Sequence, residues 1–112
     1  MKITEALKAE EKANPHGVSV RPLADSPHAV VTHITLGPGE ALKKHTTPVD
    51  VILYVLEGAG TVEIGEEKAK VSRDMLIESP TGIPHALATP GAVPFSFLEI
   101  KTPRPGTPGK VA

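Results

Sequence analysis

His45 and His85 are the two side chains whose type and placement point most directly to chemistry. His45 stands at the mouth of an apolar run in KKHTTPVDVILYVLEG (43–58), and His85 ends the segment SPTGIPH (79–85). A histidine in such a place can be a metal ligand, a proton carrier or a surface residue. The chain has no cysteine, so a metal ion here would have to use histidine, aspartate, glutamate or water. The chemistry therefore depends on whether folding brings the two imidazoles together.

Chain length and composition limit the class of protein in which His45 and His85 can lie. A chain of 112 residues is long enough for one core and too short for two, so we expect a single domain. Twelve basic residues against thirteen acidic ones give a net charge of -1, which predicts neither nucleic acid nor an anionic membrane as a partner. The N-terminus has no signal-peptide pattern and no apolar run is long enough to span a membrane, so we expect a cytoplasmic location.

The chain divides into three predicted parts. Good helix formers over residues 4–13 predict one short helix, ended by Asn14-Pro15, within an N-terminal segment of residues 1–17. Residues 18–101 contain short β-branched runs separated by Gly and Pro every eight to twelve residues, which is typical of an all-β sandwich or barrel. The Pro-rich tail of residues 102–112 cannot join a central strand and is expected to be an extended or disordered arm.

Turn signals such as Gly37-Pro38-Gly39 and Pro80-Thr81-Gly82 separate the predicted strands, and no long helical pattern interrupts them. Strands are expected at about residues 18–22, 28–36, 41–46, 51–56, 61–64, 68–72, 75–78, 83–88 and 95–101. This order favours an antiparallel jelly-roll β-barrel. The run VILYVL (51–56) is apolar on both faces, so a second sheet or another subunit must cover its outer side, and with so short a chain we expect a homodimer.

Two motifs in this region resemble those of the cupin family, G(X)5HXH(X)3–4E(X)6G and G(X)5PXG(X)2H(X)3N. Gly39 and His45 match the start of the first motif, and Gly58 matches its end. The segment PTGIPH (80–85) matches the PXGXXH part of the second motif and ends in His85. The resemblance covers roughly residues 28–101. It implies an antiparallel barrel in which three histidines and one glutamate converge on one divalent metal ion.

The sequence departs from that ligand set at two positions. Thr47 stands where the second histidine of HXH belongs, and Val51 stands where the glutamate belongs. Only His45 and His85 of the four implied ligands remain, and two imidazoles alone bind a divalent ion loosely. Asp50 is the nearest replacement for the missing acid, although strict alternation would point it away from the barrel unless a β-bulge reverses its direction.

The predicted site therefore contains two groups of residues. His45, His85 and Asp50 are the predicted metal ligands, and Thr47, Val51, Tyr54 and His33 are predicted to line a ligand pocket. If a metal ion is bound there, we expect it to be Fe, Mn, Ni or Zn. His16 and His28, each beside a proline, are interpreted as loop residues.

Several functions fit these residues. The favoured hypothesis is a barrel that binds a small organic ligand and keeps a degenerate two-histidine metal site. The alternative is a metal-dependent enzyme, such as a dioxygenase, isomerase or decarboxylase, acting on a small oxygenated substrate. A third hypothesis is isomerisation by a histidine that acts as a general acid or base without a metal ion. Such a reaction resembles what some sugar-modifying cupins do. No GXSXG elbow and no phosphate-binding glycine loop is present, so a serine hydrolase and a nucleotide-binding protein are not supported.

Overall fold

The computed structural model describes residues 1–106, and almost all of its regular structure is β-strand. The strands of this part of the chain are β1 (Ser19–Asp25), β2 (Val30–Leu36), β3 (Ala41–His45), β4 (Asp50–Glu57), β5 (Ala59–Ile64), β6 (Glu67–Ser72), β7 (Leu76–Ser79), β8 (His85–Ala88) and β9 (Phe95–Thr102). Each of them falls where a strand was predicted, and the all-β fold is confirmed.

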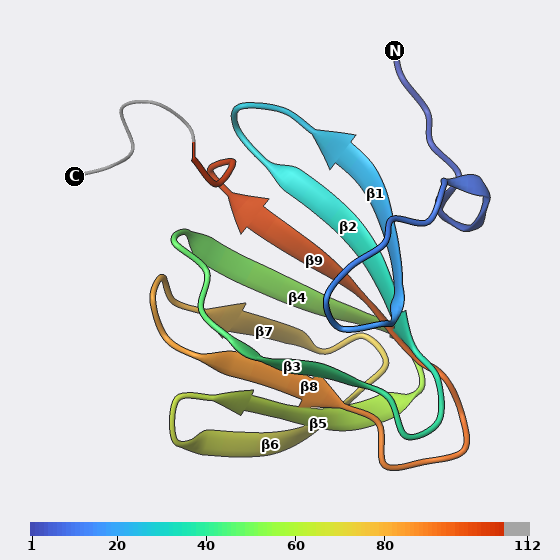
Figure 1. Ribbon diagram of the computed structural model, residues 1–112, viewed down its shortest axis with the longest axis vertical. Coiled ribbons are helices and arrows are strands. Elements are labelled where there is room, and N and C mark those ends of the chain that lie inside the picture. The colour runs from blue at the N-terminus through green and yellow to red at the C-terminus, as the bar shows by residue number, and fades with distance from the viewer. Residues whose placement is uncertain (107–112) are drawn as a thin grey trace.

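The strands form two antiparallel sheets that pack face to face as a jelly roll (Figure 1). One sheet has five strands in the order β1-β2-β9-β4-β7, and the other has four strands in the order β3-β8-β5-β6. The central strand β9 pairs with β2 and β4, which places its inward side chains in the middle of the molecule. Neighbours that are far apart in sequence, such as β3 and β8, bring distant residues side by side.

The core lies between the sheets and follows the two-residue period of the strands. On β4, Val51, Leu53 and Val55 are almost fully buried, while the residues between them are half-buried on the outer face. On β9, Phe95 and Phe97 point inward with their ring centroids 5.1 Å apart. The core cluster comprises Val18, Ile34, Leu36, Leu42, Val51, Leu53, Val55, Val62, Val71, Leu87, Phe95 and Phe97.

The N-terminal segment differs from its prediction. Only a three-residue 3-10 turn, Ala6–Lys8, forms where a helix over residues 4–13 was expected, and none of its residues is buried. An isolated helix of about ten residues is marginal in water unless an apolar face is buried against the protein, and no residue of this turn is buried. The chain after the turn instead runs beside β1, where the Lys12 backbone N–H donates to the carbonyl of Val20 at 2.8 Å.

The end of the described chain is held to the β1–β2 turn. Arg104 forms an ion pair with Asp25, with 2.6 Å between Nε and Oδ1, and its backbone N–H donates to the carbonyl of Pro27. The predicted Pro-rich tail begins within β9, and its residues 107–112 lie outside the described residues.

No helix in the described part is long and apolar enough to cross a membrane.

Candidate metal centre

His45 and His85 lie directly opposite each other on β3 and β8. Their ring centroids are 4.3 Å apart and the ring planes are inclined by 63°. Strand pairing explains this contact, because the four-stranded sheet places β8 beside β3 in antiparallel register. The two imidazoles that lie forty residues apart in the sequence therefore meet in the fold.

A β-bulge in β3 orients the His45 ring. The register with β8 shifts between Leu42 and His45, so the intervening residues leave the regular ladder. The carbonyl of Lys43, inside the bulge, lies 2.7 Å from Nδ1 of His45. A carbonyl only accepts hydrogen bonds, so Nδ1 carries the proton and Nε2 of the neutral ring carries a lone pair. A histidine fixed in this way by a backbone carbonyl is typical of metal ligands.

His85 is the most deeply buried histidine of the site, with 1% of its surface exposed. Its Nδ1 lies 3.3 Å from Oγ of Ser79, while its Nε2 is buried without a hydrogen-bond partner in the described structure. Burial is the main cause that lowers the pKa of His85, and the positive charge of a protonated His45 is the second. A neutral imidazole with a free buried nitrogen is a group prepared to accept a metal ion.

Glu99 supplies a carboxylate to this pair. One ligand atom each from His45, His85 and Glu99 can be chosen so that all three lie within 4.8 Å of one another. Glu99 is 6% exposed, and its carboxylate lies 3.6 Å from Nζ of Lys101. Its position follows from the alternation along β9, because Phe95, Phe97 and Glu99 all face the core.

Sequence reasoning did not select Glu99, although a signal was present. In a strand over FSFLEI the two-residue period places Glu99 on the same face as the core residues Phe95 and Phe97. A charged residue at an inward position of a central strand rarely occurs without a partner. Glu99 is paired in register with Leu53 on β4, two residues along that strand from Val51, where the motif places its glutamate.

Asp50 does not join this cluster. Its side chain is exposed, and Oδ1 accepts hydrogen bonds from the backbone N–H of Thr81 at 2.9 Å and from the Thr81 hydroxyl at 2.7 Å. These two hydrogen bonds lower the pKa of Asp50. Val51 is 1% exposed and faces inward, so alternation turns Asp50 outward, and no bulge in the β4–β7 pairing reverses it. Asp50 holds the β7–β8 loop instead of facing the histidines.

The four predicted pocket residues do not lie together: two are buried in the interior, and two lie on the outer face of the five-stranded sheet. Thr47 and Val51 are buried, and the carbonyl of Thr47 accepts a hydrogen bond from the backbone N–H of Gly82. Tyr54 lies on the outer face and its hydroxyl donates to Asp74 at 3.1 Å. His33 is buried on the outer face as well, in register with Arg21 and Leu98, and burial is the first cause that lowers its pKa.

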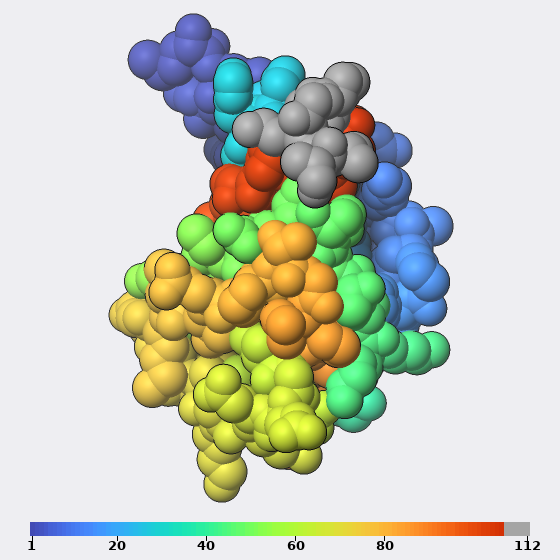
Figure 2. Space-filling view, turned by 90° about the vertical axis from the view of Figure 1, so that its left-hand side faces the viewer, coloured from blue at the N-terminus to red at the C-terminus, as the bar shows by residue number. Residues whose placement is uncertain are grey.

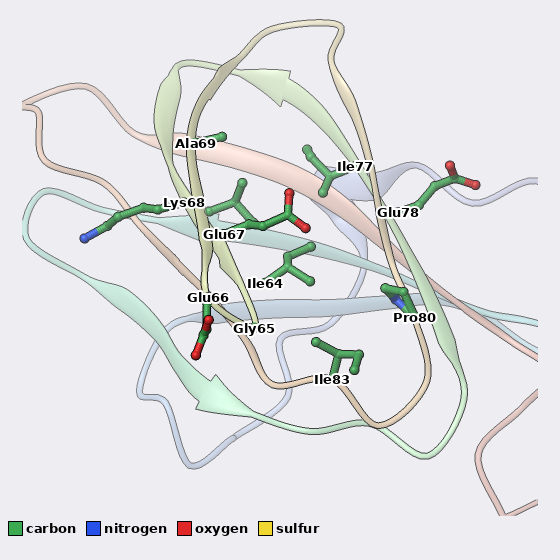
Figure 3. A pocket seen from close by; sticks show the side chains of 11 residues that line it. Ile64, Gly65, Glu66, Glu67, Lys68, Ala69, Ile77, Glu78, Pro80 and Ile83 are labelled. Atoms are coloured by element: carbon green, nitrogen blue, oxygen red, sulfur yellow. The ribbon is translucent and has the colours of Figure 1, made fainter.

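An apolar hollow of about 570 Å³ opens between the β5–β6 hairpin and β7. Its lining comprises Val62, Ile64, Gly65, Glu66, Glu67, Lys68, Ala69, Ile77, Glu78, Pro80 and Ile83. Figure 3 shows Ile64, Ile77 and Ile83 directed toward its middle, whereas Lys68 and Glu78 point away. The lining contains none of the three cluster residues. On the neighbouring surface, the segments around residues 45–50, 60–66 and 80–85 lie side by side (Figure 2).

Comparisons with known proteins agree with this architecture. The family model described as "Cupin domain" matches residues 32–101. TT1209 from Thermus thermophilus has a TM-score of 0.81 and 31% identity, covering 94% of this chain and 100% of that one. A predicted oxalate decarboxylase from Thermotoga maritima has a TM-score of 0.80 at 17% identity, over 90% of this chain and 98% of that one, which shows the fold alone.

One curated protein matches a shorter stretch. The tetracenomycin polyketide synthase protein TcmJ of Streptomyces glaucescens is 35% identical over 63 residues, which is 55% of this chain. The match spans 42% of TcmJ, so the chain covers less than half the length of that relative.

Proposed function

The chain belongs to the cupin domain family, and we propose that it is a divalent-metal cupin in which His45, His85 and Glu99 hold the ion. The ligand set is two neutral imidazoles and one carboxylate, which suits Fe, Mn, Ni or Zn. A three-residue set leaves coordination positions open, and a small oxygenated organic molecule would fill one of them. The proposal covers both a binding protein and an enzyme that uses the same ion.

The observation that carries this proposal is the buried carboxylate of Glu99 beside two imidazoles. A buried carboxylate is costly to desolvate unless a cation compensates its charge. Lys101 supplies part of that charge at 3.6 Å. His45 and His85 each offer a ring nitrogen within 4.8 Å of a carboxylate oxygen, and Nε2 of His85 is buried without a hydrogen-bond partner among the described residues. A divalent cation would satisfy all three groups at once.

Each side chain has a separate task in this proposal. Glu99 contributes the negative charge that neutral imidazoles lack, and the Lys43 carbonyl holds His45 in the tautomer that leaves Nε2 free. Ser79 steadies the His85 ring from the opposite nitrogen. When bound, the ion would act as a Lewis acid that polarises an oxygen of the ligand. Phe95 and Phe97 lie on the same face of β9 as Glu99, and burial of the carboxylate strengthens its electrostatic interactions.

The partial match to TcmJ supports an oxygen-rich organic ligand. That relative is named as a polyketide synthase protein, and polyketides carry carbonyl and hydroxyl oxygens that coordinate hard and borderline metal ions. We extend this only to the chemical class of the ligand, a small molecule with carboxylate, carbonyl or hydroxyl oxygens.

The hollow of Figure 3 favours a second candidate function, binding of an apolar molecule without metal. Its volume of about 570 Å³ lies within the range of small-molecule pockets, and three isoleucines line it. In this alternative the bound molecule would contact the apolar lining and not His45 or His85, because neither histidine lines the hollow. The two candidates differ in one respect that can be measured, the requirement for a metal ion.

The experiment that separates them is metal analysis of the protein purified without added metal and after incubation with Co²⁺. We expect close to one ion per chain in the wild type and loss of the ion in the His45→Ala/His85→Ala double variant. His28→Ala is the matched control, because His28 is an exposed histidine on the β1–β2 turn. Absence of metal from the wild type after both treatments would contradict the metal proposal and favour the apolar pocket.

We further propose that the outer face of the five-stranded sheet forms a homodimer interface. Ile52 and Tyr54 are half-buried there, and Leu76 on the edge strand β7 is 56% exposed. A second copy would cover these side chains, which a lone molecule leaves in contact with water. Sedimentation of the wild type should give a dimer, and Ile52→Lys should give a folded monomer. A monomeric wild type at micromolar concentration would contradict this assignment.

A further inference from the structure

The N-terminal segment of residues 9–20 places a third histidine beside the metal centre. The ring of His16 lies with its centroid 5.2 Å from that of His45, and the two planes are inclined by 53°. His16 is half-buried, and its pKa is lowered by burial first and then by the charges of His45 and Lys43, with Glu99 acting in the opposite direction. His16 is therefore near enough to the cluster to sense its charges, although it is not one of the three clustered ligands.

Several bonds fix this segment in place. Oδ1 of Asn14 accepts from the backbone N–H of His16 at 3.0 Å, and Nδ2 of Asn14 donates to the carbonyl of Val18 at 2.8 Å. Glu11 accepts from the hydroxyl of Ser19 at 2.8 Å, and Arg21 donates to the carbonyl of Ala9. These hydrogen bonds fix the backbone around His16, so its side chain has a defined place beside the cluster.

Lys43, in the β3 bulge, determines which ring nitrogen is protonated in both His16 and His45, and the protonated nitrogen differs between the two rings. The backbone N–H of Lys43 donates to Nδ1 of His16 at 3.0 Å, while the Lys43 carbonyl accepts from Nδ1 of His45. Nδ1 of His16 is thus the unprotonated nitrogen, and the neutral ring carries its proton on Nε2. His45 has a free lone pair on Nε2 and acts as a ligand, whereas His16 presents an N–H group and acts as a donor.

The charge of the proposed centre favours an anion as the next ligand. A divalent ion with two neutral imidazoles and one carboxylate keeps a net charge of about +1. Lys101 lies next to the carboxylate and adds a further positive charge. An anionic oxygen at an open position would neutralise this charge, and a nearby N–H donor would stabilise it by a charge-assisted hydrogen bond.

We infer that His16 donates its Nε2 proton in a hydrogen bond to a small oxyanion, such as a carboxylate, bound at the open position of the ion. This inference rests on the proposed metal site and deepens it by assigning the class of ligand. His16 is a ligand-positioning residue here and not a metal ligand. No covalent step is involved.

The test uses the full chain loaded with Co²⁺, whose visible absorption reports ligands entering the coordination sphere. Acetate is the oxyanion probe, and imidazole is a neutral probe that offers no anionic oxygen. His16→Phe keeps a ring and removes the donor, whereas His16→Gln restores both functions, since its amide oxygen can accept from Lys43 and its amide nitrogen can donate. We expect His16→Phe to weaken acetate binding about ten- to a hundredfold, the effect of one hydrogen bond to a charged group.

The remaining readouts make the outcome specific. The Kd for Co²⁺ and the affinity for imidazole should stay within about twofold of the wild type in His16→Phe, and His16→Gln should recover most of the acetate affinity. Equal acetate affinity in the wild type and His16→Phe would overturn the inference and leave the metal proposal standing. A loss of Co²⁺ affinity as large as that of His45→Ala would also overturn it, because His16 would then be a ligand. A wild type that binds no Co²⁺ would overturn the proposed function, and this inference with it.

Discussion

The Glu99→Gln variant separates a metal-binding role of the carboxylate from a structural one. The substitution keeps the size of the side chain and an oxygen in the same place, but it removes the negative charge. Two unit charges about 4 Å apart interact by about 4 kcal/mol at an effective dielectric constant of 20, and a divalent ion doubles that attraction. Part of it is offset, because the wild-type carboxylate must be desolvated and already interacts with Lys101 at 3.6 Å.

We expect a net loss of about 3 kcal/mol, which corresponds to a rise of roughly a hundredfold in the Kd for Co²⁺ or Zn²⁺. The metal-free protein should behave differently. Lys101 keeps 29% of its side chain exposed, so its ammonium group can turn to water when Glu99 is neutral. The free energy of unfolding of metal-free Glu99→Gln should therefore equal or exceed that of the wild type. Isothermal titration gives the Kd, and urea unfolding in the presence of a chelator gives the stability.

Asp50→Asn is the matched control, because the sequence alone favours Asp50 as the acidic ligand and the structure places it outside the cluster. This variant should retain the wild-type Kd and lower the stability slightly, since the Thr81 hydrogen bonds weaken. The reasoning is refuted if Glu99→Gln binds the metal as tightly as the wild type. The opposite pattern, with a large loss in Asp50→Asn only, would restore the ligand set expected from the sequence.

Three further predictions concern charge, pH and backbone geometry. Lys101→Gln should tighten Co²⁺ binding severalfold by titration, because it removes a positive charge beside the ion. The pKa of His33 is lowered from 6.5, so the unfolded chain binds more protons, and urea unfolding should show stability falling as the pH drops below about 6.5, less steeply in His33→Phe. Gly58→Ala should lower the free energy of unfolding by about 2 kcal/mol or more, because φ is +75° there and a Cβ would collide with the carbonyl oxygen of Pro94.

Much of the fold was predictable because local signals decide it. Gly and Pro turns separate short runs of β-branched residues, and the two-residue alternation fixes which side of each strand is buried. The structure of the N-terminal segment was not predictable in this way, because residues 4–13 have suitable helix propensities but no buried face to hold a helix. Helix propensity alone does not form a stable helix where no side chain of the segment is buried.

The site was only half predictable, and the two halves differ in physical origin. His45 and His85 follow from motifs that strand pairing brings together. Glu99 lies outside the motifs on a strand that pairs with β4, so its place beside the histidines depends on sheet order rather than on spacing in the sequence. His16 depends on a braced N-terminal turn and on a bulge at Lys43, and neither has a strong local signature.

The central claim is that His45, His85 and Glu99 share one metal ion, and anomalous diffraction from crystals of the Co²⁺-loaded protein tests it most directly. We expect one strong anomalous peak at about 2.0–2.2 Å from Nε2 of His45, Nε2 of His85 and a carboxylate oxygen of Glu99. A loaded crystal with no peak between these three side chains, or with its ion held by Asp50 instead, would contradict it.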